Sequence, residues 1–331
     1  MSDRIVRRGW LHLLVALSTA PALSAQRSGL AFVSNELSQD VTVIDLASNT
    51  VVAAIPVGGR ARGIQAAPDG RRVYVATSDD KPQREGAGDA IVAIDVASRK
   101  IVGRFRIGSD PEQFGITPDG TRIYASNEDG GTATAIDTRN GSHLATLVVG
   151  IEPEGVAISP DGRWAVVTSE TSNSLSVIDT RANKVVDNLL VDLRPRAAVF
   201  TPDGTRVFVT AEIGGTLTVI DGRTHQTLKT ISLERGEGKP VGVVVSPDGK
   251  RVYVANGRAG TISVIDAASY QELGTIIVGG RPWGIAIARD GRRIYTANGL
   301  SNTVSVVDAS LNKVIATIKC GQRPWGVALV R

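Results

Sequence analysis

The stretch PWGIAIARDGRRIYTANGLSNTVSVVDASLNKVIATIKCG, at residues 282–321, decides the fold because versions of it recur along almost the whole chain. Its most regular part is a β-branched run that ends in aspartate. This run occurs seven times, ending at Asp45, Asp95, Asp137, Asp179, Asp221, Asp266 and Asp308. The steps between these aspartates are 50, 42, 42, 42, 45 and 42 residues. A strand-rich repeat of this length predicts a β-propeller with four strands per blade.

Each repeat accounts for one blade. In the stretch quoted above, GIAIA is expected to form the innermost strand, RRIYTAN the second, NTVSVVD the third and KVIATIKC the fourth. An RDG or PDG turn follows the first strand in six copies, and Asp-Gly supplies the positive φ angle that a tight hairpin requires. Alternating apolar and polar residues in the third strand fit a sheet with a buried face.

The two ends of the chain are expected to share one blade, because there are seven aspartate runs but only six Asp-Gly turns. GLAFVSN (29–35), VTVID (41–45) and NTVVAAIPV (49–57) would supply three outer strands, and WGVALV (325–330) the innermost. This pairing removes the exposed strand edges of an open array. We therefore expect an all-β, seven-bladed β-propeller with four antiparallel strands per blade. It would form a single domain over residues 26–331 and fold as a monomer.

Residues 1–25 have the pattern of a signal peptide. Three arginines precede a short apolar run, Trp10 to Leu17, and small residues follow up to Ala25. The apolar run is too short to span a bilayer. We expect cleavage after Ala25, no membrane anchor, and a periplasmic or secreted protein. Arg7 and Arg8 leave twin-arginine export open beside the ordinary Sec route.

The net charge gives no reason to expect a nucleic-acid partner. The chain carries +4, of which residues 1–25 contribute +2 (three arginines and one aspartate), which leaves +2 for residues 26–331. A balance this small does not create the basic surface that nucleic acids or anionic membranes attract.

The loop that enters each innermost strand has a fixed form, a charged residue followed by proline (alanine in one copy) and a variable residue. These loops are expected to ring the mouth of the central channel, and the proline is explained by loop geometry alone. The flanking residues that we select as candidates for ligand or partner binding are Arg60, Arg62, Asp110, Glu112, Glu152, Glu154, Arg194, Arg196, Arg281, Trp283, Arg323 and Trp325.

Loops between the second and third strands reach the same face and add further acidic residues, Glu36, Asp79, Asp80, Glu128, Glu170 and Glu212. Insertions at 79–89 and around 236–238 also fall on this face, which is typical of a binding face. Arginine and tryptophan together suit a planar or anionic ligand or a protein contact. Alternatively, the arginines and carboxylates form internal pairs that hold the blades in register.

Catalytic chemistry has little support in the residue types. After the signal peptide only His143 and His225 remain, and both are expected near turns on the opposite face. We therefore expect no zinc or copper site, no covalent haem, no catalytic triad and no cofactor. The paired carboxylates Glu112 and Glu154 remain open to acid–base work or Ca²⁺ binding.

The second strands VYVAT (73–77), IYASN (123–127), VYVAN (252–256) and IYTAN (294–298) resemble the YVTN-repeat propeller family. Phrases such as AFVSNE (31–36), DPEQFGITPDG (110–120), EPEGVAISPDG (152–162) and RPWGVAL (323–329) look like the subfamily associated with pyrroloquinoline-quinone-dependent alcohol catabolism. This resemblance implies a soluble periplasmic protein that works near quinoprotein dehydrogenases and cytochromes.

Three hypotheses for the function follow. The first is a binding or accessory module that recognises a protein or a small ligand at the charged mouth, with a periplasmic dehydrogenase or cytochrome as the candidate partner. The second is a hydrolase, lactonase-like or metal-dependent, that uses the acidic residues around Glu112 and Glu154. The third is a purely structural repeat protein, in which the charges only set the register between blades.

Overall fold

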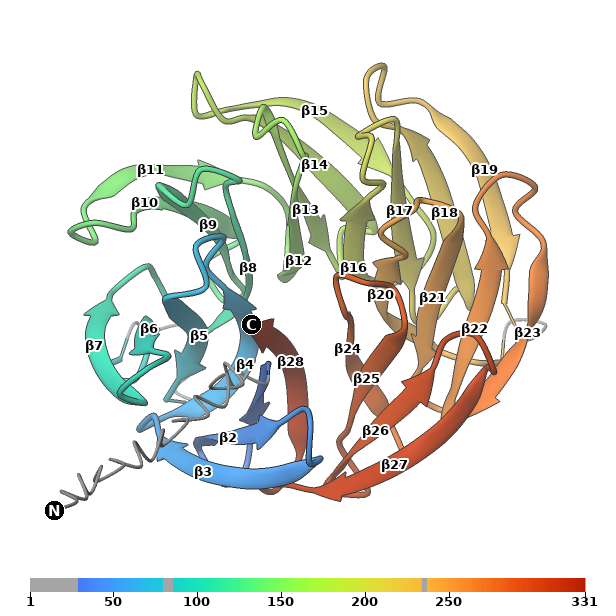
Figure 1. Ribbon diagram of the computed structural model, residues 1–331. Helices are drawn as coiled ribbons and strands as arrows, with labels where there is room; N and C mark the ends of the chain where they lie inside the picture. The colour runs from blue at the N-terminus through green and yellow to red at the C-terminus, as the bar shows by residue number, and fades with distance from the viewer. Residues whose placement is uncertain (1–28, 80–85, 234–236, 331) are drawn as a thin grey trace, which may run out of the picture.

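The structure is a computed structural model that describes residues 29–79, 86–233 and 237–330. Every regular element within these ranges is a β-strand, and the strands form seven four-stranded antiparallel sheets around a central axis (Figure 1). The seven-bladed propeller expected from the repeat is confirmed. The signal peptide expected at residues 1–25 lies outside the described residues, as does Asp80.

Equivalent strands occupy equivalent places in the seven blades. The innermost strands are β28 (Pro324–Val330), β4 (Arg60–Ala66), β8 (Pro111–Ile116), β12 (Pro153–Ile158), β16 (Pro195–Phe200), β20 (Pro240–Val245) and β24 (Pro282–Ile287). The second strands are β1 (Leu30–Asn35), β5 (Arg72–Ser78), β9 (Arg122–Asn127), β13 (Trp164–Ser169), β17 (Arg206–Ala211), β21 (Arg251–Asn256) and β25 (Arg293–Asn298).

The two outer positions of each blade are equally regular. The third strands are β2 (Asp40–Asp45), β6 (Ala90–Asp95), β10 (Thr132–Asp137), β14 (Ser174–Asp179), β18 (Thr216–Asp221), β22 (Thr261–Asp266) and β26 (Thr303–Asp308). The fourth strands are β3 (Thr50–Pro56), β7 (Lys100–Phe105), β11 (His143–Val148), β15 (Lys184–Leu190), β19 (Thr227–Ser232), β23 (Glu272–Ile277) and β27 (Lys313–Lys319).

The ring closes as expected, with both ends of the chain in one blade. Its strand order is β28-β1-β2-β3, and Leu30 pairs with Val330 in antiparallel register. In Figure 1 the blue N-terminal strands and the red β28 lie in the same blade. Because β1 finds its partner in β28, neither strand presents a free edge to other chains.

Local sequence explains the turns. All six glycines of the Asp-Gly turns have φ between 67° and 71°, the region that glycine enters without strain. The aspartates at the ends of the third strands accept backbone hydrogen bonds, as Asp266 does from Ala268 and Ser269 at 3.0 and 2.8 Å. The Asp-Gly turns and the aspartate-capped turns form the hairpins at one end of each blade, opposite the loops that enter the innermost strands.

Aromatic residues in the second strands fill the spaces between blades. Tyr124 is fully buried in a cluster with Val156 and Val167 of the next blade. Its hydroxyl donates to the carbonyl oxygen of Thr180 at 3.2 Å. Burying a side chain of this size stabilises the fold by about 1.5–3 kcal/mol. Tyr124 therefore belongs to the scaffold.

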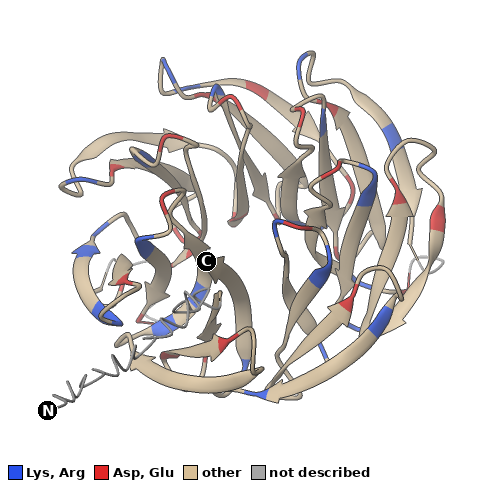
Figure 2. Ribbon diagram, in the orientation of Figure 1, with Lys and Arg blue, Asp and Glu red and all other residues tan. Residues whose placement is uncertain are grey.

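Glycines let the innermost strands approach one another closely around the channel. A Cβ on Gly155 of β12 would lie 2.3 Å from the carbonyl oxygen of Arg196 in β16. Contacts this close bring the loops that precede the innermost strands together. Figure 2 shows acidic and basic residues distributed around the ring, many of them on loops between strands.

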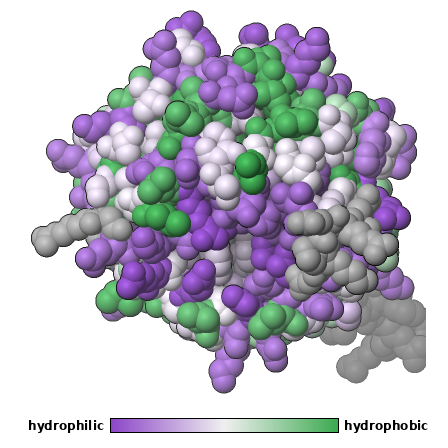
Figure 3. Space-filling view, turned by 180° about the vertical axis from the view of Figure 1, so that it is seen from behind, coloured by the Kyte–Doolittle hydropathy of each residue, from purple (hydrophilic) through white to green (hydrophobic). Residues whose placement is uncertain are grey.

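The outer surface mixes polar and apolar residues. In the view of Figure 3, hydrophilic residues occupy much of the middle of the face, and apolar residues form scattered patches around it. The described residues contain no helix with the length and hydrophobicity needed to cross a bilayer.

Candidate functional site

A β-bulge places the variable residue of each mouth loop at the channel entrance. In the blade of β12, regular pairing with β13 is interrupted between Pro153 and Val156, and the other blades have a comparable irregularity near the same proline. Bulges of this kind redirect a side chain away from the regular pleat. The side chain after the proline therefore does not follow the regular alternation of side-chain directions along the strand.

Three sets of equivalent positions make up the mouth. The inner ring is the residue after the proline position, namely Arg62, Glu112, Glu154, Arg196, Val241, Trp283 and Trp325. The outer ring is the residue before it, namely Arg60, Asp110, Glu152, Arg194, Lys239, Arg281 and Arg323. The loop ring is the residue after each second strand, namely Glu36, Asp79, Glu128, Glu170, Glu212, Gly257 and Gly299.

Arg62 anchors one group of ion pairs between neighbouring blades. Its guanidinium group contacts Glu112 of the next blade and lies 3.1 Å from Glu36 of the preceding one. Arg60 reinforces this group, with its Nη2 at 2.5 Å from Oδ1 of Asp110 and 3.3 Å from Oε1 of Glu112. These two arginines connect the blades that contain β28, β4 and β8.

Arg196 anchors a second group. Its side chain is only 8% exposed and contacts Glu154 and Glu170 of the preceding blade, while its Nε lies 2.7 Å from Glu212. The more exposed Arg194 lies 2.6 Å from Glu170. One guanidinium group thus forms ion pairs with three carboxylates from two blades.

Burial leaves the carboxyl groups of the mouth with raised pKa values. Burial raises the pKa of Glu112 to about 7, against the opposing charge of Arg62 and with the help of nearby Glu154. Burial likewise raises the pKa of Glu154 to about 8, against the opposing charge of Arg196 and with the help of the hydrogen bond and charge of Glu170. Burial and the neighbouring Glu112 raise the pKa of Glu128 to about 8. These raised pKa values mean that Glu112, Glu128 and Glu154 bind protons near neutral pH more readily than an ordinary glutamate.

The remaining part of the mouth, which we call the tryptophan sector, has a different composition. It consists of Val241, Trp283 and Trp325 in the inner ring, with Lys239, Arg281 and Arg323 around them. The two indoles stack with centroids 6.2 Å apart and an interplanar angle of 17°. The guanidinium groups of Arg281 and Arg196 lie 4.6 and 5.2 Å from the centroid of the Trp283 ring.

Glycine at two loop-ring positions makes room for this arrangement. A Cβ on Gly299 would lie 3.0 Å from Cδ1 of Trp283, so the indole occupies space that a glutamate side chain takes in other blades. The sector therefore lacks the carboxylates that pair with arginines elsewhere in the mouth. Within the described ranges, the carboxylate that pairs with Arg281 is Glu212, at 4.0 Å, and the one that pairs with Arg323 is Glu36, at 3.2 Å.

Several donors of the tryptophan sector have no acceptor. Nε of Arg281 and Nε1 of Trp283 are buried atoms without a hydrogen-bond partner, and Nε of Arg323 lies 3.2 Å from Glu36 without forming a hydrogen bond to it. Below them lies a channel cavity of about 430 Å³, lined by the innermost strands together with Val241, Trp283 and Trp325. Unpaired buried donors are costly, so an acceptor supplied by a ligand would stabilise this sector.

The structure brings eleven of the twelve candidate residues into these two parts of the mouth. The twelfth, Glu152, is exposed on the rim, where it accepts a hydrogen bond from Thr171 at 2.5 Å. Lys239 and Val241 occupy the same loop positions but were not selected, since neither residue type pointed to a function by itself. Glu36, Glu128, Glu170 and Glu212 lie at the mouth as expected and supply most of the pairing carboxylates.

The two histidines lie away from the mouth, as expected. His143 begins β11 and its Nε2 lies 2.6 Å from the carbonyl oxygen of Arg106. His225 lies in the turn before β19, and its ring packs edge-on against Trp164 with centroids 5.0 Å apart. Both positions follow third strands, at the ends of the blades opposite the mouth.

This chain is a seven-bladed β-propeller, and comparison with known proteins agrees with that class. The family model described as "YNCE-like beta-propeller" matches residues 86–246, and the one described as "Lactonase, 7-bladed beta-propeller" matches residues 193–318. Each match covers less than half of the chain. No curated protein matches the chain.

Solved structures resemble this chain along most of its length. A functionally unknown protein from Desulfotomaculum acetoxidans has a TM-score of 0.78 at 18% identity, covering 92% of this chain and 99% of that one. A putative 6-phosphogluconolactonase from Bacteroides fragilis has a TM-score of 0.75 at 18% identity, with 93% and 99% covered. Hydrazine synthase from Kuenenia stuttgartiensis has a TM-score of 0.72 at 20% identity, with 81% and 89% covered. At these identities the likeness concerns the fold.

Proposed function

We propose that this propeller is a binding module whose tryptophan sector recognises a planar, anionic ligand. The observation that carries the proposal is the pair of buried donors without hydrogen-bond partners on Arg281 and Trp283, beside Arg323, whose Nε has Glu36 at 3.2 Å. Arginine and lysine attract carboxylates, and an aromatic wall favours a flat ring system. The paired arginines of the other blades already have acidic partners and are less available to a ligand.

The setting we propose is the periplasm, beside pyrroloquinoline-quinone-dependent alcohol oxidation. Support comes from the signal-peptide pattern of residues 1–25 and from the sequence phrases that resemble that subfamily. Pyrroloquinoline quinone is itself flat and carries carboxylates, so it has the chemistry that the sector would recognise. A quinoprotein dehydrogenase or a cytochrome that handles electrons from it is the corresponding protein partner.

The binding proposal is tested by titrating the purified protein with pyrroloquinoline quinone while tryptophan fluorescence is recorded. A Trp164→Phe background removes the tryptophan that lies outside the mouth among residues 29–330. We expect saturable quenching, because the quinone would lie against the stacked indoles. Quenching that stays linear up to about 0.1 mM would refute specific binding, since it would report collisions only.

The tryptophans themselves are poor positions for a binding variant. Trp283 and Trp325 are 9% and 7% exposed, so truncation to alanine would remove core packing and cost about 3–5 kcal/mol. Arg281 and Arg323 have side chains 38% and 42% exposed, and glutamine at these positions keeps most of the volume. Arg139→Gln, on the opposite face, is the matched control.

Lactone hydrolysis is a second candidate, favoured by the lactonase family model over residues 193–318. A mouth carboxylate such as Glu112 or Glu154 would take a proton from water as the water oxygen bonds to the acyl carbon. The ring C–O bond would then break and the ring oxygen would take up the proton. Both carboxylates lie outside the matched residues. Hydrolysis of δ-gluconolactone by wild type that is lost in Glu112→Gln or in Glu154→Gln would support this candidate, and equal rates in wild type and both variants would exclude it.

A further inference from the structure

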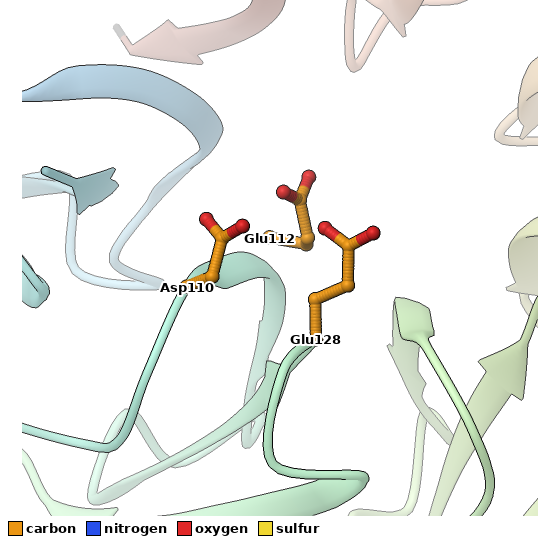
Figure 4. A group of neighbouring side chains, drawn as sticks. All are labelled: Asp110, Glu112 and Glu128. Carbon is orange, nitrogen blue, oxygen red and sulfur yellow. The ribbon is translucent and has the colours of Figure 1, made fainter. Parts of the chain in front are cut away.

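Three carboxylates gather at a single blade of the mouth. Asp110 and Glu112 flank the proline that begins β8, and Glu128 follows β9 in the same blade. One oxygen from each side chain lies within 4.8 Å of the others. Figure 4 shows the three carboxylates pointing to the same side, with Glu112 between the other two. The backbone N–H of Glu128 donates to the carbonyl oxygen of Asp110 at 3.0 Å, which holds the two loops together.

The neighbouring arginines satisfy only part of this cluster. Arg60 contacts Oδ1 of Asp110 and Oε1 of Glu112, and Arg62 contacts that same oxygen of Glu112. The other oxygen of Glu112, Oε2, has no hydrogen-bond partner, although the side chain is completely buried. A buried carboxylate oxygen without a donor is costly and calls for a cation or a proton.

With all groups ionised, the local charge is negative even when every arginine is counted. Four carboxylates, those of Glu36, Asp110, Glu112 and Glu128, contact the two arginines Arg60 and Arg62. The half-exposed Arg323 also reaches Glu36. Four negative charges against three positive charges leave an excess of −1, and Glu154 of the next blade adds to the field at Glu112.

We propose that Asp110, Glu112 and Glu128 bind a calcium ion at the mouth of the propeller. The donor set contains only carboxylate oxygens, which hard cations prefer. Ca²⁺ accepts oxygen ligands at about 2.3–2.6 Å in flexible geometry, which suits three carboxylates gathered within 4.8 Å of one another, whereas Mg²⁺ demands a near-ideal octahedron. Asp110 and Glu128 are partly exposed, so an ion can enter from solvent and complete its coordination with water.

In this arrangement each oxygen of Glu112 has a separate role. Oε1 stays with the two arginines, and Oε2 binds the ion together with oxygens of Asp110 and Glu128. The blade of β4 separates this ion from the tryptophan sector, so the ion does not depend on that sector. Calcium binding and ligand recognition are therefore separable by experiment.

The test is calorimetric titration of CaCl₂ into chelator-treated, dialysed protein, with thermal unfolding followed in parallel. We expect one ion per chain, with a Kd at or below about 1 mM, and a Tm that rises with calcium and levels off. Glu128→Gln should weaken calcium binding about tenfold or more, because it removes one charged ligand. Asp110→Asn should act in the same direction.

Glu152→Gln is the matched control, because Glu152 is the equivalent of Asp110 in the next blade and lies outside the cluster. It should bind calcium as wild type does. The proposal is overturned if wild type shows neither heat nor a Tm shift at about 5 mM CaCl₂. It is also overturned if Glu128→Gln and Asp110→Asn retain wild-type affinity. The calcium-dependent part of the Tm separates ion binding from any general loss of stability in the variants.

Discussion

Replacing Arg196 with methionine should destabilise the propeller far more than replacing any exposed arginine of the mouth. The Arg196 side chain is 8% exposed, and its guanidinium group contacts Glu154, Glu170 and Glu212. Methionine keeps much of the volume but leaves three carboxylates without their main counter-charge. Removing one partner of a buried ion pair costs about 3–5 kcal/mol. In a chain of this size, that loss lowers Tm by about 5–10 °C.

The comparison variant is Arg323→Ala. Arg323 is 42% exposed and has a single carboxylate at 3.2 Å, so its loss should cost about 0–1 kcal/mol. Urea denaturation followed by far-UV circular dichroism gives both free energies of unfolding on one scale. If Arg196→Met is as stable as Arg323→Ala, the buried pairs do not hold the blades in register.

A double substitution separates the charge effect from packing. Glu154→Gln combined with Arg196→Met removes one of the carboxylates left unpaired, so the combined loss should be smaller than the sum of the two single losses. Residues in one ion-pair network show coupling energies of about 0.5–3 kcal/mol. If the two losses of unfolding free energy are additive, the destabilisation by Arg196→Met comes from lost packing alone.

Three further changes test other parts of the structure. The pKa of Glu154 is about 8 in the folded protein, against an ordinary 4.5. Its contribution to stability is therefore complete below pH 4.5 and is lost as the pH rises through 8. Glu154→Gln should flatten the fall in the urea midpoint between about pH 5 and 9. Gly155→Ala should lower the free energy of unfolding, measured by urea denaturation, by about 1–3 kcal/mol, because its Cβ would press on the carbonyl oxygen of Arg196. Gly280→Ala should lower it less, because the nearest atom to its Cβ is a side-chain hydroxyl at 3.2 Å. Deleting residues 324–331 removes β28 and exposes the edge of β1, so size-exclusion chromatography should show oligomers or aggregates in place of a monomer peak.

The repeat allowed the fold to be predicted in detail. Because the aspartate runs and Asp-Gly turns recur at fixed spacing, each strand could be placed, and the surplus aspartate run required β1, β2 and β3 to share a blade with β28. The turn residues, the strand patterns and the number of repeats were sufficient to predict the fold, since a propeller repeats one supersecondary unit.

The division of the mouth could not be predicted from the sequence. Whether Arg62 and Arg281 have carboxylate partners depends on distances between blades, which no spacing within one repeat reveals. Glycine at position 299 in place of a glutamate was the available signal, because it leaves room for Trp283. Likewise, the sequence paired Glu112 with Glu154 as possible calcium ligands, whereas the structure groups Glu112 with Asp110 and Glu128. The mouth loops alone did not show this, because Glu128 comes from a different loop of the same blade.

The most direct measurement of the ligand proposal is the Kd of pyrroloquinoline quinone for Arg281→Gln/Arg323→Gln, determined by calorimetry beside wild type and Arg139→Gln. Removing both charges should weaken binding about tenfold or more, since both guanidinium groups attract a carboxylate and Nε of Arg281 has no hydrogen-bond partner of its own. The urea midpoint should change little, because both side chains are half-exposed. Equal affinity in the double variant and in wild type would contradict recognition at the tryptophan sector.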